Sequence, residues 1–261
     1  MPVRRLAMRR RVTSDGGERA EIVYRDWDPA QAAVVVCDMW DAHSCVSAMR
    51  RVTEMAPRMN EVLAALRAEG ALIVHAPADC MDYYQASAAR QRAVRAPHVD
   101  APVPFDWQDW EADELTRLPV TLTDPGSCSC SAAKPCGGQR RVWSRQTPLI
   151  DILEIDAITD DGQELVNLLE QRAIMDVVIM GVHTNACVLG RPYGIRQLVY
   201  LGKRPVLCRD LTDAFHRDPR GHRWGTDQIV SHIERRWCPS ITSNQLVGGE
   251  PFQFSDEAAS L

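Results

Sequence analysis

The fold is decided by residues 176–210, which read DVVIMGVHTNACVLGRPYGIRQLVYLGKRPVLCRD. This stretch begins with an apolar run over 176–181, continues with a helical pattern over 185–201, and ends with a second apolar run over 205–210. Continuous apolar runs of this length are typical of strands buried on both faces of a parallel sheet. The stretch therefore predicts a strand–helix–strand crossover, and with it an α/β protein.

The same alternation of strands and helices continues on both sides of this unit. The further elements that we expect are a strand over 32–37, a helix over 58–70, a strand over 71–75, a helix over 161–172, a helix over 226–237 and a strand over 240–242. Such alternation predicts a three-layer α/β/α fold whose central sheet is mostly parallel. Residues 1–30 are polar, and we expect them to form an extended arm or an edge hairpin.

Length and composition are those of an ordinary globular protein. The chain has 261 residues and a mass of 29.2 kDa, and 45% of its residues are hydrophobic. This composition supports a large core and excludes disordered, collagen-like and coiled-coil classes. The net charge is −5, and apart from Arg9, Arg10 and Arg11 the arginines are scattered, so we expect no nucleic-acid partner. No apolar run approaches the roughly 18–20 residues of a membrane helix, so we expect no membrane partner.

The cysteine count and the N-terminus bear on the compartment. The chain has nine cysteines, and its basic start, MPVRRLAMRRRV, has no apolar segment behind it. We therefore expect no secretory signal and a reducing, cytoplasmic location, in which a thiol either fills the core or does chemistry.

Three chemically capable residues follow the expected strands. Asp38 ends one strand, His75 ends the next, and Cys187 falls at the start of the helix after the third. Sites in parallel sheets form at the carboxyl ends of strands, and N–H groups at a helix start stabilise a thiolate or an oxyanion. Asp38 could accept the thiol proton and return it to a leaving group. A packed cysteine, a capping aspartate and a structural histidine are the competing interpretations.

The segment from 177 to 215, VVIMGVHTNACVLGRPYGIRQLVYLGKRPVLCRDLTDAF, resembles the nucleophile segment of the isochorismatase-like cysteine hydrolases. These include nicotinamidases, N-carbamoylsarcosine amidase and related small-amide hydrolases. AVVVCDMW, which contains Asp38, resembles the first strand of that superfamily. The resemblance extends from about residue 31 to 245, with 78–140 unmatched. It implies one domain over 1–261, comprising an N-terminal arm (1–30), a long loop or insertion over the site (78–148) and a tail (248–261).

The resemblance also implies a set of catalytic residues. The superfamily uses an Asp–Lys–Cys triad, in which Asp38 matches the general base and Cys187 the nucleophile. It further implies a cis peptide between Val182 and His183, with the N–H groups of His183 and Cys187 forming the oxyanion hole. Arg145, in VWSRQTPLIDI, stands where the superfamily has its lysine. Arginine keeps the positive charge but cannot lose its proton. Lys134 is the alternative, and a surface ion pair is the competing interpretation of Arg145.

Residues around the expected site differ from those of relatives. Nicotinamidases bind a metal ion after the second strand, but here HAPADCMDYYQ lacks the second histidine. We therefore expect no metal, no cofactor and no nicotinamidase activity. Trp40, His43 and His75 are candidate substrate-binding residues, although a structural tryptophan is an equal alternative for Trp40. Arg191 and Tyr193 are candidates for binding a substrate carboxylate, or for a subunit contact.

Three cysteines lie close together in the long loop. Cys128, Cys130 and Cys136, with His98 as a fourth ligand, are a less favoured candidate for a zinc site. Paired Cys-x2-Cys motifs are absent, and a loop rich in glycine, serine and proline can hold free thiols.

Two functions compete. The first is a cysteine hydrolase that cleaves a C–N bond of a small amide, ureide or carbamoyl compound through a thioester on Cys187. The second is a non-catalytic or thiol-redox protein of the same fold that acts in binding. The resemblance also implies a homo-oligomer, a dimer or a tetramer.

Overall fold

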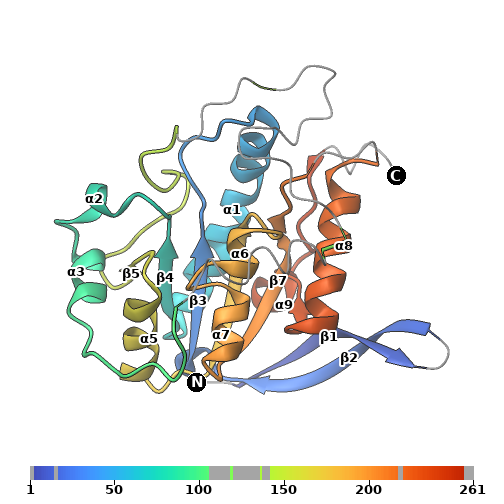
Figure 1. Cartoon of the computed structure of the whole chain (residues 1–261), viewed down its shortest axis with the longest axis horizontal. Helices are drawn as coiled ribbons and strands as arrows, with labels where there is room; N and C mark the ends of the chain where they lie inside the picture. The colour runs from blue at the N-terminus through green and yellow to red at the C-terminus, as the bar shows by residue number, and fades with distance from the viewer. Residues whose placement is uncertain are drawn as a thin grey trace.

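A central sheet organises the computed structural model, which describes residues 3–14, 17–105, 118–119, 136, 142–216 and 220–255. Eight strands of this described part form one sheet in the order β2-β1-β8-β7-β6-β3-β4-β5 (Figure 1). The strands are β1 (Arg4–Ser14), β2 (Gly17–Trp27), β3 (Ala32–Cys37), β4 (Leu72–Ala76), β5 (Ala157–Ile158), β6 (Asp176–Val182), β7 (Arg204–Asp213) and β8 (Ser240–Ile241). The strands from β8 to β5 run parallel, whereas β1 pairs antiparallel with both β2 and β8.

Helices cover both faces of the sheet, as the sequence predicts. One face carries α1 (Val46–Ala68) and α9 (Asn244–Val247). The other carries α2 (Met81–Tyr84), α3 (Ala88–Val94), α5 (Gly162–Gln171), α6 (Cys187–Gly190), α7 (Ile195–Tyr200) and α8 (His222–Arg236). Strand β3 is wholly buried, and its alternate side chains enter the two cores: Val35 packs on one face, and Val34 and Val36 pack on the other. The three-layer α/β/α prediction is confirmed.

The structure revises several predicted elements. Helix α1 begins at Val46, twelve residues before the expected start at Arg58, and continues through Pro57. The helix expected over 185–201 is divided into α6 and α7, because Pro192 and Gly194 lie between them. Strands β1 and β2 form an antiparallel pair at the edge of the sheet, which projects from the body in Figure 1. None of the described helices has the length and apolar composition that crossing a membrane requires.

A glycine brings together the strand ends that carry the candidate site. Gly181 has a φ of +117°, and a Cβ there would lie 2.0 Å from the carbonyl oxygen of Cys37 on β3. Only glycine permits this close approach of two backbones. The residues that follow β6 are therefore held against Asp38 at the end of β3.

Candidate active site

Asp38 lies directly after β3 and is fully buried. Its φ of 46° is in the left-handed region. One carboxylate oxygen, Oδ1, accepts hydrogen bonds from the backbone N–H of Ala78 at 2.7 Å and from the Tyr193 hydroxyl at 3.2 Å. These donors fix the orientation of the carboxylate and leave its second oxygen, Oδ2, directed to the neighbouring groups of the site.

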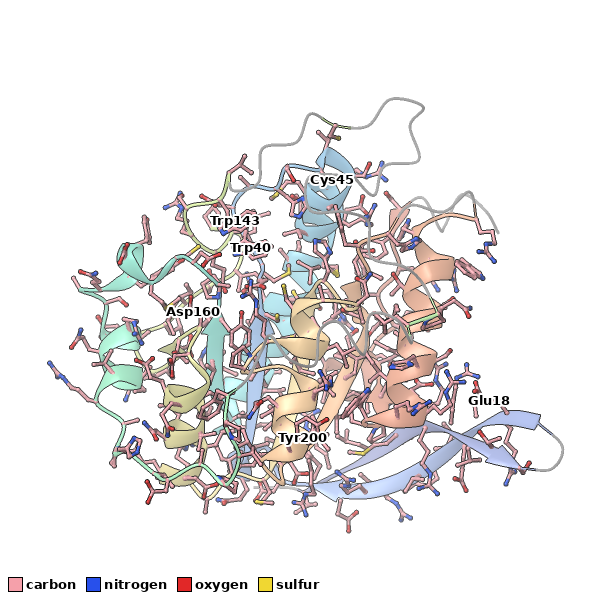
Figure 2. The ribbon with its side chains drawn as sticks, in the orientation of Figure 1. Glu18, Trp40, Cys45, Trp143, Asp160 and Tyr200 are labelled. Carbon is pink, nitrogen blue, oxygen red and sulfur yellow. The ribbon has the colours of Figure 1, made fainter. Side chains whose placement is uncertain are left out.

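Two tryptophans bind Ala78, the residue whose N–H donates to Asp38. The indole N–H groups of Trp40 and Trp143 both donate to the carbonyl oxygen of Ala78, at 3.2 and 3.3 Å. The two rings stack with centroids 4.2 Å apart and planes 16° from parallel (Figure 2). The stack therefore supports the position of Asp38 through Ala78. Sequence reasoning did not identify Trp143 or Ala78, and no motif marks them.

Cys187 is the first residue of α6, which follows the loop after β6. Its side chain is buried and its thiol interacts with Asp38. Burial, together with the negative charge of Asp38, raises the pKa of Cys187 to about 12. Burial also raises the pKa of Asp38 to about 6, although Arg191 and the Cys187 thiol act in the opposite direction. At neutral pH the pair is therefore a thiol beside a carboxylate, and the helix start does not produce a resting thiolate.

Arg191 supplies the positive charge of this group. It lies four residues after Cys187, and its Nε is 3.8 Å from Oδ2 of Asp38. It also interacts with the Cys187 thiol, and its side chain is 26% exposed. Burial opposes its charge, but the Asp38 carboxylate and, at high pH, the Cys187 thiolate outweigh that effect and raise the pKa of Arg191. The i, i+4 spacing, which places two residues on one helical face, is the sequence signal that could have identified this arrangement.

Arg145 does not join these residues, contrary to the expectation for the triad. Its guanidinium donates to the Tyr83 hydroxyl at 2.6 Å and lies 3.8 Å from Asp41. Its side chain is 40% exposed, because the segment that follows Trp143 turns it toward the surface. The surface ion pair is therefore the interpretation that fits. Lys134, the other candidate, lies outside the described residues.

Two backbone N–H groups, of His183 and Cys187, follow β6 on the way into α6. The peptide between Val182 and His183 is cis, as the resemblance implies. Within the described part of the chain, no backbone acceptor takes the N–H of His183 or of Cys187. Both groups thus remain able to donate to an oxygen that develops negative charge near the Cys187 sulfur.

A histidine pair adjoins this loop. His43 accepts at Nδ1 from the Cys45 N–H, so its Nε2 carries the proton and donates to Nε2 of His183 at 3.2 Å. His183 in turn contacts the carbonyl of Asp213 at 3.3 Å. Burial lowers the pKa of His43 to about 4, and burial and the neighbouring His43 hold the pKa of His183 well below its usual range; the nearby Arg51 adds to both effects. Both rings are therefore neutral at physiological pH.

Comparisons with known proteins bear on this arrangement. A cysteine hydrolase from Pseudomonas syringae pv. phaseolicola 1448A superposes with a TM-score of 0.52 at 14% identity, over 85% of this chain and 93% of that one. The chain has the isochorismatase-like fold. An isochorismatase from Pseudomonas putida KT2440 gives a TM-score of 0.49 at 13% identity, over 84% of this chain and 91% of that chain. An isochorismatase family protein from Burkholderia thailandensis gives a TM-score of 0.48 at 15% identity, over 84% of this chain and 94% of that chain. No protein-family model matches the sequence, and no curated protein matches it.

Some expected site residues lie elsewhere on the isochorismatase-like fold. His75 is fully buried and contacts Gln146 through Nδ1 at 3.1 Å and Asp156 through Nε2 at 3.3 Å. Asp156 also pairs with Arg67 at 2.8 Å. Both ring nitrogens of His75 therefore have partners in a buried network, which favours its structural interpretation over substrate binding.

The cysteine-rich loop of this chain is described only at Cys136, which packs against Cys45. Cys128 and Cys130 lie outside the described residues, and His98 is an exposed residue near Asp100. The described residues contain no group of three or more His, Cys, Asp or Glu side chains that could hold a metal ion. The zinc site therefore gains no support from His98 and Cys136.

Proposed function

We propose that the protein is a cysteine hydrolase that cleaves a C–N bond of a small amide, ureide or carbamoyl compound. The observation that carries this proposal is the convergence of Asp38, Cys187 and Arg191 at the carboxyl ends of β3 and β6. The isochorismatase-like fold, shared with a protein described as a cysteine hydrolase, supports it.

The protonation states support an order of proton transfers. Asp38, whose pKa is about 6, is ionised at neutral pH, whereas the Cys187 thiol is protonated. Asp38 takes the thiol proton as the sulfur attacks the substrate carbonyl carbon, and the carbonyl π electrons move to oxygen. The N–H groups of His183 and Cys187 hold that oxyanion. When the tetrahedral intermediate collapses, the C–N bond breaks and Asp38 gives its proton to the departing nitrogen.

Hydrolysis of the thioester repeats the sequence with water. Asp38 accepts a proton from a water molecule as the water oxygen attacks the thioester carbon, and the C–S bond then breaks. The proton returns from Asp38 to the sulfur, which restores the thiol. Arg191 stays charged throughout and stabilises both the carboxylate and the transient thiolate, because a guanidinium does not exchange its proton at these steps.

Neighbouring side chains fit positioning and binding roles. Tyr193 and the Trp40–Trp143 stack orient Asp38, directly or through Ala78. We assign His43, next to His183, to the wall of the substrate site.

The test is release of ammonia or amine from a panel of small primary amides, ureides and carbamoyl acids. Cys187→Ala should abolish turnover, whereas Cys238→Ala, which removes another buried cysteine, should retain it. Activity that survives in Cys187→Ala would refute the proposal, as would silence of the wild type across the panel. The alternative, a thiol-redox role, has less support, because redox-sensing thiols have a low pKa and Cys187 has a raised one.

We also propose a homo-oligomer in the cytoplasm, as the resemblance implies. Light scattering by the purified protein measures its mass, and a monomer at micromolar concentration would contradict the assembly.

A further inference from the structure

A cavity lies between β7, α8 and the segment over 251–254. Its volume is about 210 Å³. It shares no lining residue with the group formed by Asp38, Cys187 and Arg191. Its basic lining residues are Arg9 from β1, Arg209 from β7, and His222 and Arg223 from the start of α8, and its acidic ones are Asp210 and Asp227, the latter 3.8 Å from Arg223. Three arginines from separate elements therefore line one hollow, where they outnumber the carboxylates.

Arg209 is the central group. No carboxylate of the described chain lies within ion-pair distance of its guanidinium, whose Nη1 donates instead to the Ser240 hydroxyl at 3.1 Å. Burial lowers the pKa of Arg209 and the charge of Arg9 lowers it further, against the opposing effect of the Glu234 and Asp210 carboxylates. A partly buried cation beside a like charge is costly unless an anion compensates it.

The acidic residues nearby are already engaged. Glu234, whose side chain is fully buried, pairs with Arg9 at 2.7 Å and with Arg11 at 3.3 Å. Asp210 accepts from the backbone N–H and the hydroxyl of Ser243 and from the N–H of Phe252. Both carboxylates therefore engage other donors and form no ion pair with Arg209, whose charge they compensate only in part from a greater distance.

The start of α8 adds further donors. Its N-cap is Gly221, which has no side chain to cap the helix, and His222, Arg223 and Thr226 of the first turns line the cavity. The first N–H groups of a helix lack partners within the helix and favour negative charge. The first N–H groups of α8 therefore add to the preference of the arginines for a bound anion.

We propose that this cavity binds a small multivalent oxyanion, either a phosphate group or a polycarboxylate. Guanidinium groups match both, since their planar N–H donors pair with two oxygens of one anion. The volume is several times the ~30 Å³ of one water molecule, so such an anion fits. Thr212 lines the cavity and donates to the carbonyl of Gly181 at 2.7 Å, which joins the cavity wall to the strand before the nucleophile.

The experiment is calorimetric titration of the full chain with inorganic phosphate and with citrate, and with acetate and chloride at matched ionic strength. Saturable binding of phosphate or citrate, weakened at least tenfold in Arg209→Gln, is the expected result. The tighter of the two identifies the anion class. Arg235→Gln removes an arginine of α8 outside the cavity and serves as the control, with unchanged binding expected.

Binding no stronger than that of acetate, or equal binding in wild type and Arg209→Gln, would overturn the proposal. If Arg209→Gln does not fold, Arg223→Gln at the same cavity decides. Its side chain is 56% exposed, so its replacement leaves the core intact, and it should weaken binding severalfold.

Discussion

Replacing Arg191 with methionine should slow the chemistry of Cys187 without reshaping the site. The side chain keeps its approximate length but loses the charge that lies 3.8 Å from Asp38. At that distance, with an effective dielectric of about 20, Coulomb's law gives about 4 kcal/mol. Because Arg191 is partly exposed, solvent screens this Coulomb energy, and we take about half of it, ~2 kcal/mol. That free energy corresponds to roughly a 30-fold change in an equilibrium constant or a rate constant.

The rate of alkylation of Cys187 by iodoacetamide, followed by peptide mass spectrometry from pH 5 to 9, measures the effect without a known substrate. We expect the Arg191→Met variant to react about 10–100 times more slowly at pH 7, because both the Asp38 carboxylate and the thiolate lose their stabilising cation. Arg145→Met should react as the wild type does, since Arg145 pairs with Tyr83 and Asp41. Slow labelling in Arg145→Met with normal labelling in Arg191→Met would refute the assignment of the cation.

Three further variants test other parts of the structure. The pKa of Asp38, about 6, lies above that of a free aspartate, so the folded state holds this proton more tightly and stability falls as pH rises from about 4 to 6. The free energy of unfolding of Asp38→Asn, measured with urea at pH 7, should therefore exceed that of the wild type by about 1–3 kcal/mol, and it should no longer change between about pH 4 and 6. Turnover should disappear in the same variant. A lower free energy of unfolding would contradict this expectation. Gly181→Ala places a Cβ 2.0 Å from the Cys37 oxygen and should lower the free energy of unfolding by about 4 kcal/mol or more. Gly202→Ala, with open space around its Cβ, should lower it by about 1 kcal/mol. Equal soluble yield and equal melting temperature of the two variants would contradict this expectation. Arg51→Met breaks a buried ion pair with Asp213 at 2.7 Å and should cost about 3–5 kcal/mol by urea unfolding, so a change below 1 kcal/mol would indicate that Asp213 finds another donor.

Local patterns in the sequence predict the sheet well. The apolar runs at β3, β4, β6 and β7 are long and have flanking helical patterns, so the parallel core follows from them. Helix α1 escapes the prediction over its first half because Arg50, Arg51 and Pro57 interrupt the expected pattern, although Arg51 is in fact buried against Asp213.

The candidate site also contains some residues that the sequence predicts and others that it does not. Asp38 and Cys187 follow strand ends, which is a local property that the sequence displays. The i, i+4 spacing of Arg191 from Cys187 is visible in the sequence, but the approach of Arg191 to Asp38 depends on tertiary packing. Arg145 was misplaced because a match of position to the family's lysine carries no information on side-chain direction. Contacts that join distant segments, such as Trp143 with Ala78, depend on tertiary packing and have no local signal.

The stacked indoles of Trp40 and Trp143 also make this part of the molecule optically distinctive. Stacked chromophores whose centroids lie 4.2 Å apart share their electronic excitations, so the near-ultraviolet spectrum of the pair differs from that of two isolated tryptophans. Because both indoles donate to Ala78, the residue whose N–H binds Asp38, a change in this spectrum would report a displacement of that carboxylate. The stack is therefore an intrinsic spectroscopic probe of the candidate site, which can be read before any substrate is identified.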